Sequence, residues 1–290
     1  MPELPEVETV KNGLNRLLKN KKVQSVVYDW PKGFPNSQAD VNNFLIGASI
    51  LTVKRRGKSL IVNLSSKYCL VIHLKMTGQL VFRGKEQFGA GHPNDSLVGP
   101  LPDRSTRVIL TFDDDSKLFF NDQRKFGWMR LLPEIEVANL NFMKKLGPEP
   151  LSSSFKNTEF RSRVRRRKNS SIKATILDQT VLAGVGNIYA DESLWIAKIH
   201  PSSLSGTLSD NKLNLLIKSI KEVFTKSISL GGSTDKNYVD AEGKKGSYLE
   251  FANVFRKEGQ PCPRCNTIII KTRVASRGTH LCPKCQRKTK

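Results

Sequence analysis

The chain has 290 residues, of which 38% are hydrophobic and 26% charged, a composition typical of a folded protein of two or three units. No run of 18 apolar residues occurs, which excludes a membrane-spanning helix, and the acidic, proline-interrupted start at 1–6 is unlike a signal peptide. Lys and Arg number 48 against 26 Asp and Glu, a net charge of +22 that favours a polyanionic partner such as duplex DNA. Association with ribosomes or an anionic membrane is the alternative, but the sequence shows no basic amphipathic helix for a membrane surface.

The first half of the chain predicts one helix followed by short strands. Val7, Val10, Leu14 and Leu17 recur at helical spacing, which predicts a helix over 3–20 with one apolar face. The β-branched segments that follow are separated by Gly, Pro, Asp and Asn, the pattern of an antiparallel sandwich or barrel. These segments are 23–29, 49–55, 59–64, 68–74, 79–83, 107–112, 117–121 and 128–132.

Beyond residue 138 the periodicity becomes helical. Helices are predicted over 160–167, 172–178, 190–197 and 211–230, and a Gly-rich charged stretch follows at 231–246. We therefore expect an α+β multidomain protein with four parts: an N-terminal helix with an antiparallel β-sandwich (2–135), a helical domain (138–230), a loop or linker (231–250) and a cysteine module (251–290).

Four of the five cysteines predict a metal site. Cys262, Cys265, Cys282 and Cys285 form two Cys-x-x-Cys pairs, a spacing typical of structural Zn²⁺ with four thiolates and no open position for catalysis. The segments 267–274 and 279–281 predict a β-hairpin with Arg277 at its tip. Two disulfides are the alternative, although reduced thiols and a cytoplasmic location fit better; Cys69 lies in an apolar run typical of a core.

Pro2 carries a possible chemistry of its own. Once Met1 is removed, Pro2 exposes a secondary amine, and an α-amino group titrates near pH ~8, so part of it is neutral at pH 7. Such an amine can attack the anomeric carbon of a sugar, and Glu3 can move protons beside it. Judged locally, however, a proline at the start of a helix is usually no more than a helix start.

Further motifs follow in one order along nearly the whole chain. They are Met-Pro-Glu-Leu-Pro-Glu-Val-Glu-Thr at 1–9, Arg-Gly-Lys at 56–58, His-Leu-Lys-Met-Thr-Gly at 73–78, Asn-Asp-Gln-Arg-Lys-Phe-Gly at 121–127, Gly-Val-Gly-Asn-Ile-Tyr-Ala at 184–190 and Arg-Gly-Thr at 277–279. In this order the sequence resembles the bacterial formamidopyrimidine-DNA glycosylase family. The resemblance implies a helix–two-turn–helix element in the helical domain and excision of 8-oxoguanine and ring-opened purines from duplex DNA, with cleavage by β,δ-elimination in base excision repair. It also implies a monomer that acts in the bacterial cytoplasm, at the nucleoid.

The resemblance also assigns roles to residues. Pro2 would form a Schiff base with C1′ of the sugar, Glu3 would protonate the opening sugar, and Glu6 would position the site. Lys58 would hold the phosphate beside the lesion, and Arg277 is counted with these residues because it would contact the backbone there.

A second group would bind DNA. A base must leave the stack before its sugar can be attacked, and Met76, Arg124 and Phe126, the void-filling residues, would occupy the space it leaves. His92, Lys173 and Asn187 would contact the backbone. Judged locally, the alternatives are a core Met, a core Phe and a solvated Arg.

The sequence departs from the family pattern in a few places. Lys125 stands where a second Arg is common, Phe255 and Arg256 stand near a usual Tyr-Gly-Arg, and the segment 231–237 is unusual after its paired glycines. The basic run 161–168 belongs to no motif and is given only a nonspecific role on DNA. Two alternatives stay open: an endonuclease VIII-like enzyme for oxidised pyrimidines, and a noncatalytic zinc protein that binds damaged DNA.

Overall fold

The computed structural model describes residues 2–92, 94–233 and 248–288. The chain divides into two compact units, each treated separately below: residues 1–144 with 230–247, and residues 145–229 with 248–290. Most of the segment predicted as a loop or linker at 231–250 lies outside the described residues.

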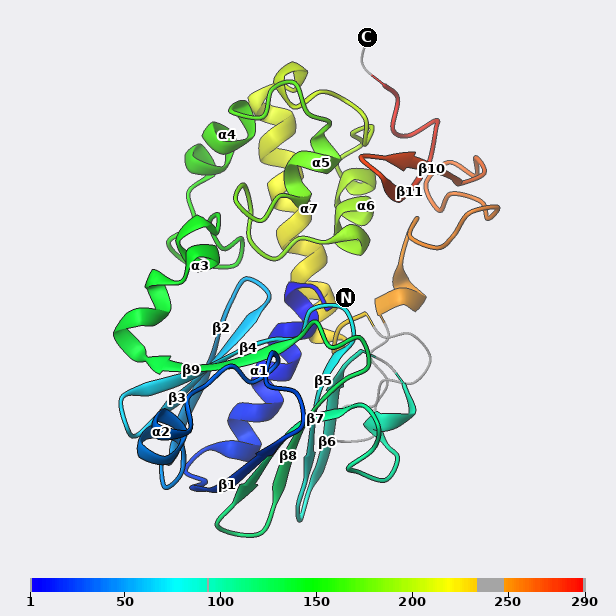
Figure 1. Ribbon diagram of the computed structural model, residues 1–290. Helices are drawn as coiled ribbons and strands as arrows, with labels where there is room; N and C mark the ends of the chain where they lie inside the picture. Colours follow the sequence, from blue (N-terminus) through cyan, green and yellow to red (C-terminus); the bar gives the residue numbers. More distant parts are fainter. Residues whose placement is uncertain (1, 93, 234–247, 289–290) are drawn as a thin grey trace. The chain divides into compact units, whose positions relative to one another are not determined.

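The first unit is an antiparallel β-sandwich (Figure 1). One sheet has the order β1-β7-β8-β5-β6 and the other the order β2-β3-β4-β9. Apolar residues from both sheets and from α1 form one buried core between them. The strands are β1 Val23–Tyr28, β2 Ile50–Arg56, β3 Ser59–Leu64, β4 Tyr68–His73, β5 Gly78–Arg83, β6 Gln87–Gly91, β7 Thr106–Phe112, β8 Lys117–Asp122 and β9 Trp128–Pro133.

All eight strands predicted in this unit are present, each within a residue or so of its expected bounds. Strand β6 was not predicted, because it contains two glycines and lacks β-branched residues. This strand pairs with β5 and brings Phe88 against α1, where a Cβ on Gly13 would lie 2.4 Å from the Phe88 ring. Its position therefore depends on tertiary packing that strand propensity does not encode.

The N-terminal helix α1 spans Leu4–Leu18, and the predicted apolar face is buried. The helix packs against the edge strands β2 and β6 of the two sheets. Asn15 joins it to β2 like an added strand: its Nδ2 donates to the Val53 carbonyl, and its Oδ1 accepts from the Val53 N–H, both at 2.6 Å. Arg55 adds an ion pair to Glu8 at 2.6 Å. These contacts satisfy an otherwise open sheet edge and fix the start of the chain on the sandwich.

The second unit contains the four predicted helices and the cysteine module. Helix α6 packs against α7 and against β11 of the hairpin, so the cysteine module shares a unit with the helices. The helices of the chain after α1 are α2 Gln38–Asp40, α3 Asn141–Lys145, α4 Asn157–Arg165, α5 Ile172–Leu177, α6 Asn187–Ile196 and α7 Asp210–Ser229. Short π- or 3₁₀-helices lie at Val41–Leu45, Asp95–Leu97, Glu134–Asn139, Ser205–Thr207 and Tyr248–Phe251.

The predicted hairpin is present with a shifted turn. It consists of β10 Ile270–Val274 and β11 Arg277–Leu281. Ala275 and Ser276 both have positive φ, +49° and +60°, as a two-residue type I′ turn requires. Arg277 pairs with Val274 and is therefore the first residue of β11, beside the tip and not at it.

Candidate active site and DNA-contacting residues

The start of the chain is held by the carboxylate of Glu6. Pro2 is buried and Glu3, the N-cap of α1, is 3% exposed. The Glu3 N–H donates to Oε2 of Glu6 at 2.8 Å, and the two residues form a capping box. The other oxygen of Glu6 accepts from the N–H and the hydroxyl of Ser233, at 2.8 and 2.7 Å. The carboxylate of Glu6 thus connects Glu3, the residue next to the predicted nucleophile, with Ser233, which follows two consecutive glycines.

The backbone at positions 231 and 232 adopts a conformation that only glycine adopts readily. Gly231 and Gly232 have φ of +75° and +95°, and a Cβ on Gly232 would lie 3.3 Å from Cγ of Glu6. The close approach of this segment to Glu6 therefore depends on glycine.

Lys58 lies in the tight turn between β2 and β3, after Gly57 with φ +58°. Its side chain is 8% exposed. Burial and the positive charges of Lys75 and Lys58 together lower the pKa of the nearby His73 to about 3. The His73 imidazole is therefore neutral, and its Nδ1 accepts from the Lys75 N–H at 3.0 Å.

The register of the sheets brings two loops together. Met76 lies between β4 and β5, and Arg124 and Phe126 lie between β8 and β9. His73 pairs with Trp128 across β4 and β9, and Gly78 pairs with Asp122 across β5 and β8. Since both loops leave and re-enter the sheets at these paired residues, they lie side by side at one end of the sandwich.

The void-filling residues are exposed on these loops. Met76 is 39% and Phe126 54% exposed, so the alternative that they are core residues is wrong. Arg124 is also exposed, with its guanidinium carbon 4.9 Å from the centre of the Phe126 ring. Large apolar side chains kept in solvent at a loop tip suit insertion into a base stack.

Asp122, which the sequence analysis did not single out, holds both loops. Its side chain is 1% exposed, and Oδ1 accepts from the Thr77 hydroxyl and from the Arg124 N–H, the latter at 3.2 Å. Its Oδ2 accepts from the Gly127 N–H at 2.6 Å. The buried carboxylate thus fixes the loop that carries Met76 to the loop that carries Arg124 and Phe126.

The half-buried His92 lies just after β6, in the same unit. Its N–H donates to the Gly78 carbonyl at 3.1 Å, and its own carbonyl accepts from the buried side chain of Gln79. Its backbone is thus anchored at the first residue of β5, next to the Met76 loop.

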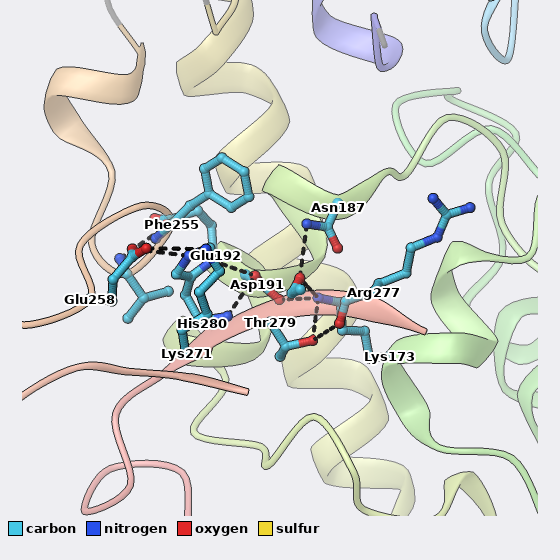
Figure 2. A network of polar contacts seen from close by, with 12 residues as sticks. Lys173, Asn187, Asp191, Glu192, Phe255, Glu258, Lys271, Arg277, Thr279 and His280 are labelled. Carbon is cyan, nitrogen blue, oxygen red and sulfur yellow. Dashed lines mark hydrogen bonds and ion pairs between the residues drawn. The ribbon is translucent and has the colours of Figure 1, made fainter. Parts of the chain in front are cut away.

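In the second unit, Asn187 contacts the hairpin at the residue that follows Arg277 (Figure 2). Asn187 is the first residue of α6, and its Nδ2 donates to the Gly278 carbonyl at 3.0 Å. The exposed Arg277 precedes that glycine. An exposed guanidinium and the N–H groups at a helix start are both groups that can bind phosphate.

Lys173 differs from its expected place. A lysine that contacts DNA directly needs an accessible ammonium group, whereas the side chain of Lys173 is 0% exposed and points into the protein. Asp191 and Glu192, adjacent buried acids on α6, were also missed by the sequence analysis. Glu192 accepts from the backbone N–H groups of residues 253, 254 and 255 at 2.8–2.9 Å and so holds that segment to α6. Two acids within a helix that is otherwise largely apolar are the signal that could have revealed them.

The four cysteines of the module are free thiols, which makes the disulfide alternative wrong. Their Sγ atoms all lie within 4.8 Å of one another. Tetrahedral Zn²⁺ with Zn–S bonds of ~2.3 Å places its sulfurs ~3.8 Å apart, so the set fits one ion. Without an ion, burial and the neighbouring thiols raise the pKa of Cys285 to about 12, whereas hydrogen bonds from Thr267 lower that of Cys265 to about 6. A bound Zn²⁺ would hold all four groups as thiolates.

The surroundings of the four cysteines also suit a structural zinc site. Trp195 donates through Nε1 to Cys262 at 3.4 Å, and its ring lies 3.8 Å from the Arg264 guanidinium. Because all four ligands come from the protein, the ion has no open position and serves the fold of the hairpin.

Four arginines of the basic run contact the protein itself. Arg161 and Arg165 pair with Asp210 at 3.3 and 2.8 Å, so they join α4 to the start of α7. Arg163 pairs with Glu159 at 3.0 Å, and Arg167 pairs with Asp178 at 2.8 Å. These side chains contribute contacts within the protein, and the nonspecific role of the run on DNA stays a prediction.

A basic chain with a β-sandwich, a helical unit and a hairpin that fits Zn²⁺ belongs to the class of zinc-containing nucleic-acid-binding proteins. Among the residues that the structure describes, no helix has the length and apolar character needed to span a bilayer.

Comparison with known proteins defines the class more closely. Residues 1–129 match the formamidopyrimidine-DNA glycosylase N-terminal domain, 146–238 its H2TH domain, and 259–287 a zinc finger found in FPG and IleRS. The formamidopyrimidine-DNA glycosylase of Pediococcus pentosaceus is 40% identical over 287 residues, 99% of each chain. That of Listeria innocua is 38% identical over 99% of this chain and 100% of its own.

Solved structures agree. A Lactococcus lactis FPG mutant in complex with DNA containing Fapy-dG has a TM-score of 0.87 at 36% identity, covering 99% of this chain and 100% of its own. The Lactococcus lactis Fpg bound to DNA with an abasic site has a TM-score of 0.86 at 35% identity with the same coverage. The chain belongs to the formamidopyrimidine-DNA glycosylase family, and the resemblance inferred from its motifs is confirmed.

Proposed function

We propose that this protein is a bifunctional DNA glycosylase and abasic-site lyase that excises 8-oxoguanine and formamidopyrimidines from duplex DNA in base excision repair. The observation that carries the proposal is the arrangement at the chain start, where Pro2 and Glu3 lie on a helix N-terminus held by Glu6. We expect the protein to act as a monomer. Its free thiols favour a location in the cytoplasm, and its DNA substrate favours a location at the nucleoid.

Pro2 is the proposed nucleophile. After removal of Met1, its nitrogen attacks C1′ of the extruded nucleotide, the bond from C1′ to the base breaks, and the base leaves with a proton. The positive end of α1 favours the neutral, nucleophilic amine. The sugar ring opens as the iminium ion forms, and Glu3 supplies the proton that the ring oxygen takes up.

The iminium ion makes strand cleavage possible. It acidifies C2′, so loss of a C2′ proton expels the 3′ phosphate and a second elimination expels the 5′ phosphate. Lys58, buried in its turn beside the neutral His73, holds the phosphate next to the lesion. Its fixed charge stabilises the negative charge that develops on the leaving phosphate.

The void-filling residues and the second unit bind the rest of the duplex. Met76 and Phe126 enter the stack, and Arg124 pairs with the orphaned base. His92, Asn187 and Arg277 contact phosphates, and the zinc ion keeps the hairpin folded so that Arg277 is presented. These roles correspond to four parts of the chain. They are a catalytic domain (2–135), a helical domain (138–230), a lesion-recognition segment (231–250) and a zinc hairpin (251–290).

Excision assays on two duplexes test the substrate class. The proposal predicts rapid release of 8-oxoguanine opposite cytosine and slow release of thymine glycol. The reverse order would identify an endonuclease VIII-like enzyme. Tight binding without release from either duplex would identify a noncatalytic damage-binding protein.

A further inference from the structure

The ammonium group of Lys173 makes three described contacts inside the second unit. Its Nζ donates to the Gly278 carbonyl at 3.0 Å and to the Thr279 hydroxyl at 2.8 Å, and it lies 2.7 Å from Oδ1 of Asp191. Both Lys173 and Asp191 are 0% exposed. Two hydrogen-bond acceptors and one carboxylate at ion-pair distance thus surround the buried ammonium charge.

Asp191 fixes the next residue of the same strand. Its Oδ2 accepts from the His280 N–H at 2.9 Å and lies 3.3 Å from the imidazole Nδ1 (Figure 2). The far side of that ring, Nε2, lies 3.1 Å from Glu258. The pair of Lys173 and Asp191 thus determines the path of β11 directly after Arg277.

We propose that Lys173 and Asp191 are positioning residues that hold β11 so that Arg277 and Asn187 can contact one segment of DNA backbone. The inference rests on the proposed function, since it concerns how the same protein binds DNA. Asn187 takes part because its Nδ2 and the Lys173 Nζ donate to the same carbonyl, that of Gly278. Lys173 therefore acts through the hairpin and has no phosphate of its own.

Removal of the negative charge of Asp191 distinguishes a positioning role of Lys173 from a direct contact between Lys173 and a phosphate. Asp191→Asn removes a negative charge and makes the protein more cationic, which by electrostatics alone strengthens binding to DNA. If Asp191 positions the hairpin, the same variant instead binds a duplex with a tetrahydrofuran abasic analogue about tenfold more weakly, the loss expected for one charge-assisted contact. Asp178→Asn is the matched control because Asp178 lies in the same unit and its described side-chain partners are Arg167 and Thr180, not residues of the hairpin. Binding by Asp191→Asn as tight as that of the control would overturn the proposal.

A double-mutant cycle gives the second test. If Lys173 acts through Arg277, Lys173→Met weakens binding, but adding it to Arg277→Ala costs little more. The magnitude of the slope of log K against log salt then decreases by ~0.9 in each single variant. It decreases by the same amount in the double variant, because only one phosphate contact is lost. Additive losses, with the slope falling by ~1.8 in the double variant, would show that Lys173 has its own phosphate contact.

Removing one partner of a buried ion pair can unfold a protein. A third variant therefore tests the proposal without leaving a buried charge unpaired. Lys173→Met combined with Asp191→Leu replaces both charges by apolar side chains of similar size, which is often tolerated. With one zinc ion bound and an unchanged melting temperature, this variant is expected to bind about tenfold more weakly. Wild-type affinity in that folded variant would refute the positioning role. Because the tetrahydrofuran analogue offers no glycosidic bond to a base, these readouts are independent of whether Pro2 is the nucleophile.

Discussion

The carboxylate of Asp122 accepts a hydrogen bond from the backbone N–H of Gly127 at 2.6 Å. The same side chain also accepts from Thr77 and from the Arg124 N–H, so every partner that it has on these loops is a donor. An amide at this position would set its NH₂ group against one of those donors.

Asp122→Asn should therefore loosen both loops. We expect a loss of ~1–3 kcal/mol in the free energy of unfolding, the cost of an unsatisfied buried group. Excision of 8-oxoguanine from duplex DNA should fall more than cleavage of a preformed abasic site, because only the first requires extrusion of a base. Single-turnover rates on the two substrates measure the difference.

The matched control is Asp114→Asn, in the turn at the other end of β8, where Asp114 accepts from the Ser116 N–H at 3.3 Å. This variant should slow both substrates equally or not at all. An equal slowing of both substrates by Asp122→Asn would show that the loops take no part in extrusion.

The secondary structure was largely predictable, because β-branched and apolar residues at periods of 2 and 3.6 depend on local sequence. The zinc ligands were predictable for a similar reason, since each pair lies within one turn. Asp191 was not, because its partners Lys173 and His280 are distant along the chain. The link that Asp122 makes between two loops was not, because it depends on the distant Thr77, and β6 was missed because its glycines are selected by packing. The burial of Lys173 belongs to the same group: nothing near it in sequence shows that Asp191 and Thr279 surround it.

Loss of the metal should weaken DNA binding while the sandwich stays folded. Cys282 is fully buried among the four thiols, and Cys282→Ser removes one of four ligands. We expect the zinc content to fall well below one ion per chain and DNA affinity to fall with it, because the hairpin carries Arg277. Metal analysis, a binding titration and near-ultraviolet circular dichroism measure these effects. Undiminished binding by the metal-free protein would refute the role of the hairpin.

The salt dependence of DNA binding should distinguish basic residues that contact phosphates from basic residues that pair with acids of the protein. If about six phosphates are neutralised, log K falls against log salt with a slope near −5. Arg163 pairs with Glu159 within the protein, so Arg163→Ala should leave that slope unchanged, whereas Arg277→Ala should reduce its magnitude by ~0.9. A clear change of slope in Arg163→Ala would restore the run to the DNA interface.

The neutral His73 should make the protein sensitive to acid. In the unfolded chain this group titrates near pH ~6.5, but in the folded protein its pKa is lowered to about 3. Between these values the unfolded state binds the extra proton, so this group's contribution to stability falls as the pH falls. His73→Asn keeps an acceptor for the Lys75 N–H without titrating.

Urea unfolding at several pH values between 6.5 and 4 should give a flatter dependence for His73→Asn than for the wild type. The difference in slope is at most ~1.4 kcal/mol per pH unit, the value for one proton. The carboxylates titrate in both proteins and cancel in the comparison. Parallel curves for the two proteins would contradict the assignment of His73.

Borohydride trapping on DNA that contains 8-oxoguanine tests the central claim most directly, provided that intact mass first establishes whether Met1 is present. We predict one covalent adduct with the mass of the Met1-free protein plus DNA that has lost its 8-oxoguanine base, linked at Pro2, and little or none from Pro2→Gly. Full-rate trapping by protein that still carries Met1, or by Pro2→Gly, would contradict the account.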